Sequence, residues 1–161
     1  MWSALLCLST GLVFAFGGDS AATQKLRGER LQKLDANKTV RVDELLGAFD
    51  GQLCILPPYA SAVSLSGIQG QLINAYLKKN DVLILEDEWG LVIVDRDDIR
   101  LLRIKRSAQS DILSAGAALS SKVLDARPEY EPLDCVSSQD ALLTKVSFRG
   151  RNYLVLGQMR R

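Results

Sequence analysis

The chain has 161 residues, of which 47% are hydrophobic and 24% are charged, and its formal net charge is +1 at pH 7. This length and composition predict one globular domain, exclude an intrinsically disordered chain, and give no electrostatic bias toward nucleic acid. Histidine is absent, which excludes Ser-His-Asp and Cys-His catalysis and every metal site with a histidine ligand.

The beginning of the chain is typical of an export signal. No charged side chain precedes Asp19, and small residues follow the apolar run. We therefore expect a signal peptide over residues 1–22, cleaved after Ala22 or after Ser20, and a single domain over residues 23–161. No Lys or Arg precedes the run, so an uncleaved membrane anchor and a buried N-terminal helix are the alternatives.

Cysteine usage agrees with export. Cys7 lies inside the expected signal, so Cys54 and Cys135 would form an even pair in the exported chain. Such a pair predicts one disulfide, with Cα atoms within about 7 Å. The alternative is a pair of buried free thiols, whereas a metal site is not expected because zinc needs four ligands.

The first half of the domain contains short expected elements. Residues 20–36 predict a surface helix or a mobile arm, and residues 42–49 predict a short helix ended by Gly51. The apolar run Gln52–Leu56 predicts a strand stopped by two prolines. The clearest helix follows Ser66, its expected N-cap. Its apolar face has helical spacing and consists of Leu65, Ile68, Leu72, Ile73, Tyr76 and Leu77.

The middle of the chain predicts an antiparallel meander of three strands. These strands are Val82–Leu85, Trp89–Val94 and Ile99–Lys105, and acidic turns connect them. The second strand is apolar on both faces, so we expect it to be central in a sheet.

The last third predicts a helix and a hairpin. The helix covers residues 111–126 with Ser110 as its cap, and Leu142–Phe148 pairs with Tyr153–Met159. The expected fold class is α+β, with one antiparallel sheet of about five or six strands and helices packed on one face.

Two patterns could carry chemistry. Gly67-Ile68-Gln69-Gly70 has the spacing of a G-x-x-G loop that clamps nucleic acid, but its middle residues are not basic, so we interpret it as a helix start. Paired carboxylates could hydrolyse a glycosidic bond or bind a cation. The strand between the two acidic turns would separate them by roughly 17–20 Å, so we expect solvated turns. The acidic residues are Glu86, Asp87, Glu88, Asp95, Asp97 and Asp98.

Arginine and tyrosine mark the predicted partner-binding residues. Arg149 and Arg151 lie on the terminal hairpin together with Lys145, and Arg160 follows near the end of the chain. Tyr59 comes directly after the two prolines, on a stiff loop. Both residue types are enriched at binding hot spots.

These observations predict an exported, non-enzymatic binding protein. We expect a periplasmic inhibitor or an immunity-type protein that neutralises a protein partner, with no catalytic residue, metal ligand, cofactor or nucleic acid. Contact with a membrane would occur only through an uncleaved N-terminal segment. The main alternative is a membrane-tethered accessory subunit of an envelope complex, and a carboxylate-based hydrolase is the third.

Overall fold

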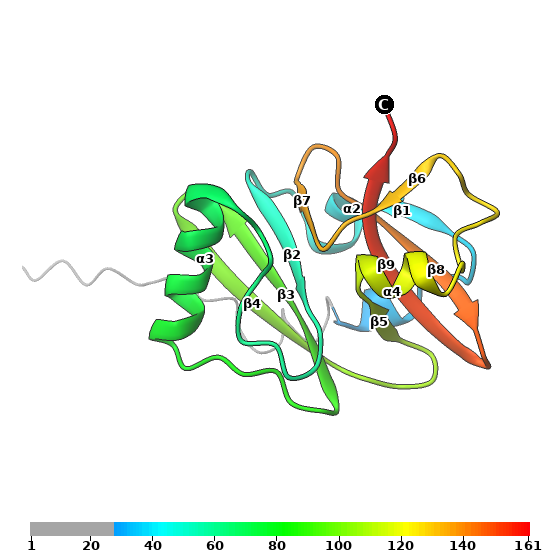
Figure 1. Ribbon diagram of the computed structural model, residues 1–161, viewed down its shortest axis with the longest axis horizontal. Coiled ribbons are helices and arrows are strands. Elements are labelled where there is room, and N and C mark those ends of the chain that lie inside the picture. Colours follow the sequence, from blue (N-terminus) through cyan, green and yellow to red (C-terminus); the bar gives the residue numbers. More distant parts are fainter. Residues whose placement is uncertain (1–27) are drawn as a thin grey trace, which may run out of the picture.

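Two β-sheets organise the part of the chain that the computed structural model describes, residues 28–161 (Figure 1). The four-stranded sheet consists, in spatial order, of β4 (Asp98–Lys105), β3 (Glu88–Asp95), β2 (Gln52–Leu56) and β7 (Cys135–Ser137). All its pairs are antiparallel. The expected central strand is confirmed, because β3 lies between two neighbours and buries six consecutive residues.

The five-stranded sheet is built around the terminal hairpin. It contains, in order, β1 (Thr39–Arg41), β8 (Leu142–Phe148), β9 (Arg151–Met159) and β5 (Asp111–Leu113), and β6 (Tyr130–Pro132) also pairs with β9. The predicted hairpin of β8 with β9 is confirmed. Its turn is only Arg149 and Gly150, both with positive φ, as two-residue hairpin turns require. The pair of β5 with β9 is parallel.

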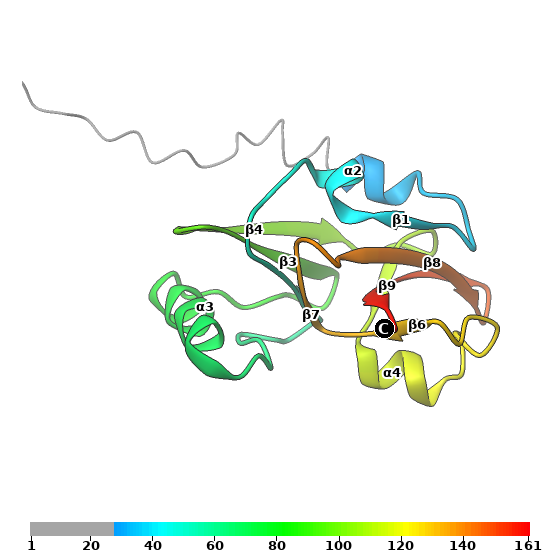
Figure 2. The ribbon, with the colours of Figure 1, turned by 90° about the horizontal axis from the view of Figure 1, so that it is seen from above.

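The helices are few and short. α2 (Val42–Leu46) ends at Gly47, earlier than the expected Gly51. α3 (Gly67–Lys79) packs on the four-stranded sheet, whereas α4 (Ala115–Ser120) packs beside β5, β6 and β9 (Figures 1 and 2). The fold is thus α+β with mostly antiparallel pairing, as predicted. The prediction of a single sheet is wrong, because the structure has two sheets, and α3 packs on one while α4 packs beside the other.

The largest core joins the two sheets. The four-stranded sheet contributes Trp89 and Leu91, and the five-stranded sheet contributes Leu143 and Leu154, all fully buried. Residues 28–32 are helical. Leu31 within this helix and Leu34 just after it complete the core. The predicted surface helix is thus confirmed for residues 28–32, with Leu31 and Leu34 as the buried stripe, and the alternative of a mobile arm is wrong for residues 28–36. Residues 20–27 of this prediction lie outside the described part of the chain.

Two predicted elements differ from the structure. Val82–Leu85 is not a strand, because β2 occupies the position beside β3. The helix expected over residues 111–126 starts later: residues 111–113 form β5, and the hydroxyl of Ser114 caps α4 by accepting from the Ala117 N–H (3.3 Å). Ser110 is buried and is not the cap.

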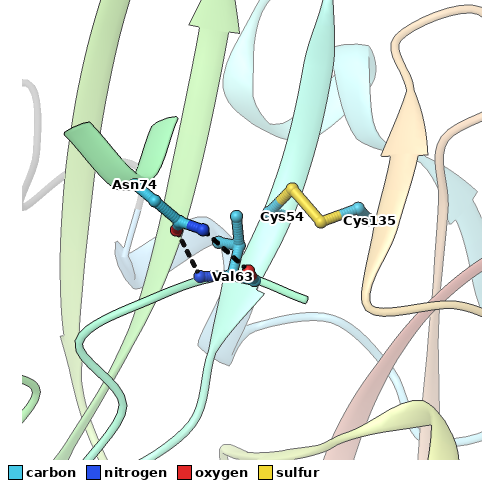
Figure 3. The surroundings of a disulfide bond; sticks show 4 residues. All are labelled: Cys54, Val63, Asn74 and Cys135. Carbon is cyan, nitrogen blue, oxygen red and sulfur yellow. Dashed lines mark hydrogen bonds between the residues drawn. A yellow bond between two sulfur atoms is a disulfide. The ribbon is translucent and has the colours of Figure 1, made fainter. Parts of the chain in front are cut away.

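The predicted disulfide is present. Cys54 and Cys135 face each other on the paired strands β2 and β7, with Cα atoms 4.1 Å apart and a sequence separation of 81 (Figure 3). The bond is consistent with an oxidising compartment outside the cytoplasm.

The predicted signal peptide over residues 1–22, with Cys7, lies outside the described residues. From residue 28 onward, no helix has the length and apolar character needed to cross a membrane.

Candidate protein-binding edge

Tyr59 lies in a tight turn directly after β2. The Ala60 N–H donates to the Pro57 carbonyl (3.1 Å), Pro58 occupies the second position of the turn, and Tyr59 has a φ of 65° at the third. These features describe a type II turn, whose third position strongly favours glycine. A bulky residue there is a true conformational outlier, and such outliers gather at functional sites.

A second segment runs beside this turn. The Tyr59 N–H donates to the Ile84 carbonyl (2.8 Å), and the Ile84 N–H donates to the Ala60 carbonyl (3.1 Å). Ile84 is buried, so its neighbours Leu83 and Leu85 point outward and are 50% and 52% exposed, beside a Tyr59 that is 65% exposed. We call these three exposed residues, Tyr59, Leu83 and Leu85, the Tyr59 edge. Figure 1 shows the segments after β2 and before β3 along the lower border of the four-stranded sheet.

The chain around Tyr59 is held from both sides. The disulfide joins β2, which precedes the turn, to β7. After the turn, Val63 donates its N–H to the side-chain oxygen of Asn74 (2.8 Å), and the Asn74 amide donates back to the Val63 carbonyl (3.2 Å), as Figure 3 shows. The Tyr59 edge therefore projects from a fixed backbone.

Polar groups surround the Tyr59 edge. Arg106 donates through Nη1 to the Glu86 carbonyl (2.9 Å), and its N–H donates to the Asp87 carbonyl (2.8 Å). Partial desolvation, followed by the Glu86 carboxylate, raises the pKa of the Tyr59 phenol above its usual value. The phenol is thus a neutral hydrogen-bond donor at physiological pH.

The acidic residues do not form one site. Lys105 pairs with Asp87 (2.7 Å) and with Glu88 (3.3 Å), and the hydrogen bond from Lys105 holds the pKa of the Asp87 carboxyl below its usual value. The other acidic turn, around Asp95 and Asp98, lies at the opposite end of the β3–β4 hairpin, roughly 23 Å away. Within residues 28–161, no group of three or more His, Cys, Asp and Glu side chains is placed to hold a metal ion.

The buried carboxylate of Asp111 links Arg151 to Arg106. Asp111 is 1% exposed, and it accepts two hydrogen bonds from Arg106 (2.8 Å each) and one from Arg151 (3.2 Å). Arg106 follows β4, whereas Asp111 and Arg151 begin β5 and β9, so this cluster ties one sheet to the other. The sequence did not predict a role for Asp111, because the residue was expected in the first turn of a helix. The only feature of the sequence that indicates the ion pair is the spacing of five residues between Arg106 and Asp111.

The remaining predicted partner-binding residues lie elsewhere. Arg149 occupies the hairpin turn and stacks over the Phe148 ring (4.9 Å). Arg160 lies at the far end of β9, about 25–30 Å from Arg151 at the usual rise per residue. Lys145 is buried and donates to the carbonyls of residues 32 and 34 (2.8 Å each), and burial lowers the pKa of its amine. Arg151 thus joins the Asp111 cluster, whose Arg106 donates to the Glu86 carbonyl next to Leu85, whereas Arg149 and Arg160 lie apart from it.

The two glycines of the G-x-x-G sequence have structural explanations. Gly67 has a φ of 81° at the start of α3. A Cβ atom on Gly70 would lie 1.8 Å from the Leu65 carbonyl oxygen. Close packing of α3 against its leading loop therefore accounts for this spacing.

Comparison of the chain with protein-family models, curated proteins and solved structures finds no match.

Proposed function

We propose that this chain is an exported binding protein that neutralises a protein partner in an oxidising compartment and carries out no reaction itself. The observation that carries this proposal is the Tyr59 edge: one tyrosine and two leucines, each at least half exposed, on a fixed backbone. The disulfide supports the periplasm or the extracellular space as the site of action.

The Tyr59 edge has the anatomy of a binding surface. Protein interfaces place a few large side chains in the centre, with tyrosine enriched among them, and a polar rim around these side chains. Here the rim consists of Glu86, Asp87, Lys105 and Arg106. Lys105 and Arg106 are already paired with carboxylates of this chain, so they are positioned before a partner arrives.

Rigidity supports the same proposal. Binding orders side chains and loops at an entropic cost, and a surface that is fixed in advance avoids much of that cost. The type II turn, the disulfide and the Asn74–Val63 hydrogen bonds restrict the backbone that carries Tyr59. Tyr59 adopts a strained backbone conformation that favours glycine, and a role of its side chain in binding would explain why a tyrosine occupies this position.

The test is co-purification of the full chain from its native envelope, compared with Leu85→Glu and with Leu72→Glu as a matched control. Leu72 is an exposed leucine on α3, at 58%, and lies away from the Tyr59 edge. We expect a partner that wild type and Leu72→Glu retain and that Leu85→Glu binds at least about tenfold more weakly. Equal retention by both variants would contradict the proposal, as would a purified chain that turns over a substrate by itself.

A further inference from the structure

A second site lies beside the five-stranded sheet, and it does not depend on the proposed function. A hollow of about 390 Å³ opens between α4, β6 and the end of β9, where Arg160 stands. We propose that this hollow, here called the α4 hollow, binds an apolar group that ends in a carboxylate. Figures 1 and 2 show α4 beside β6 and β9.

The walls of the α4 hollow are mainly apolar. Leu119 on α4 is 58% exposed at its mouth, and Leu124 and Pro132 are buried in its wall. The volume falls within the usual range for small-molecule pockets, about 300–1,000 Å³. Such walls favour a hydrocarbon or an apolar side chain as the body of the ligand.

Tyr130 cannot provide the polar contact. Its hydroxyl donates to the Val155 carbonyl (2.7 Å) and lies 3.1 Å from the Leu142 carbonyl. Burial raises the pKa of this phenol far above its usual value, so it stays neutral. A polar head on the ligand must therefore be recognised by the charged residues of the hollow.

Two arginines provide that recognition. The Arg127 guanidinium donates to the hydroxyls of Thr39 (2.5 Å) and Thr144 (2.6 Å) and to the Asn37 carbonyl, all of which are neutral acceptors. Within the described part of the chain, no carboxylate forms an ion pair with Arg127 or Arg160, whereas the neighbouring Arg161 is paired with Asp140 (3.0 Å).

The charge balance of the α4 hollow is positive. Asp125 lines it together with Arg127 and Arg160, so the charged residues of the lining sum to +1. A ligand carboxylate would add the missing negative charge, and charge-assisted hydrogen bonds from arginine to carboxylate are among the strongest in proteins. The carboxylate could belong to a free aliphatic acid or to the C-terminus of a protein with an apolar last residue.

The experiment titrates the full chain with decanoate below its micellar concentration, with decanol, and with a short peptide that ends in leucine as the free acid or as the amide. Binding is followed by calorimetry and by amide chemical shifts. We expect saturable binding of at least one carboxylate probe, at least about tenfold tighter than its uncharged counterpart, with shifts centred on Ala118 and Leu119. The probe that binds identifies the source of the carboxylate.

Two matched pairs of variants locate the site. Arg160→Gln should weaken binding about tenfold, whereas Arg161→Gln should leave it within about twofold. Leu119→Asp should abolish binding, and Leu72→Asp, at an equally exposed leucine on α3, should not. Equal affinity for decanoate and decanol, no binding of either carboxylate probe, or an Arg160→Gln variant that binds like wild type would overturn the proposal.

Discussion

At the residue scale, Tyr59 adopts a backbone conformation that favours glycine, yet it carries the side chain that we propose for binding. Five other non-glycine residues have positive φ in the described part of the chain, and none of them is aromatic. Asn37, Asp81 and Arg96 are examples, and polar residues tolerate this conformation better than a tyrosine does. The turn itself gains nothing from the phenol, which is mostly exposed.

We therefore predict that Tyr59→Gly stabilises the fold and removes binding. A left-handed conformation costs a residue with a Cβ about 1–2 kcal/mol, and the added chain entropy of glycine offsets about 0.5–1 kcal/mol of the relief. The free energy of unfolding in urea should rise by about 0.5–1 kcal/mol, while affinity for the co-purified partner falls. A variant that is both less stable and equally able to bind would show that the tyrosine serves the turn.

Asp111 is the residue on which the junction between the sheets depends. Asp111→Asn would leave the Arg106 and Arg151 guanidiniums without the carboxylate that they share. Removing one partner of a buried ion pair costs about 3–5 kcal/mol, so we expect a loss near the lower value, since both arginines are partly exposed. Urea denaturation measures it, with the exposed Asp97→Asn as a control that should change stability by less than about 0.5 kcal/mol. A loss no larger than that of the control would mean that the cluster is incidental.

At the element scale, two helical glycines give a matched comparison. A Cβ on Gly70 of α3 would meet the Leu65 carbonyl oxygen at 1.8 Å, whereas a Cβ on Gly116 of α4 has no neighbour within 4 Å. Alanine favours a helix over glycine by about 1 kcal/mol, but a clash with backbone cannot be relieved by a rotamer change.

Gly70→Ala should therefore lower the free energy of unfolding by at least about 2 kcal/mol. Gly116→Ala should raise it by about 0.5–1 kcal/mol. Thermal or urea unfolding of both variants decides the point. A Gly70→Ala variant at least as stable as wild type would mean that the contact between Gly70 and the leading loop is not formed in solution.

Most strands that the sequence predicts correctly contain runs of consecutive buried residues, whereas β4, also predicted correctly, alternates buried and exposed residues toward its end. The runs of β2 and β3, and the paired runs of β8 and β9, need no knowledge of their neighbours to be recognised. Val82–Leu85 also alternates like a strand, but β2 occupies the edge of β3 that it would need, and no local pattern indicates this. The same error hid two of the three residues of the Tyr59 edge, because Leu83 and Leu85 belong to the segment predicted as a strand.

The error over residues 111–126 has a tertiary cause. Ser110 followed by Asp111 resembles a helix start, but the carboxylate bonds to Arg106 and to the distant Arg151, and residues 111–113 pair with β9. The helix begins only at Ala115. Tyr59 could be proposed from its proline loop, whereas the cluster of Arg106 with Asp111 and Arg151 depends on contacts between the sheets that no local pattern indicates.

At the scale of the whole molecule, the disulfide adds a covalent constraint between distant parts of the described chain. It joins β2 to β7 across 81 residues of sequence. Chain-entropy arguments give such a loop about 4 kcal/mol of stabilisation, which is a large part of the stability of a domain of this size. Because the two cysteines are opposite each other on paired strands, the bond adds to an existing pairing and does not impose a new one.

We predict that a reduced chain, or Cys54→Ala with Cys135→Ala, unfolds at a clearly lower urea concentration. The loss should be about 3–4 kcal/mol, and α3 should loosen first because Cys54 belongs to the core beneath it. Urea unfolding with and without reductant measures the effect on the full chain. Identical midpoints would show that strand pairing alone holds β7.

We propose that the chain binds a protein through the Tyr59 edge, and hydrogen exchange of the full chain, alone and with the partner that co-purifies with it, can locate the bound surface. We expect the partner to slow exchange in residues 57–66 and 82–88 and to leave the β8–β9 turn and the outer face of α3 unchanged. Slower exchange confined to that turn or to α3, with residues 57–66 and 82–88 unaffected, would contradict it.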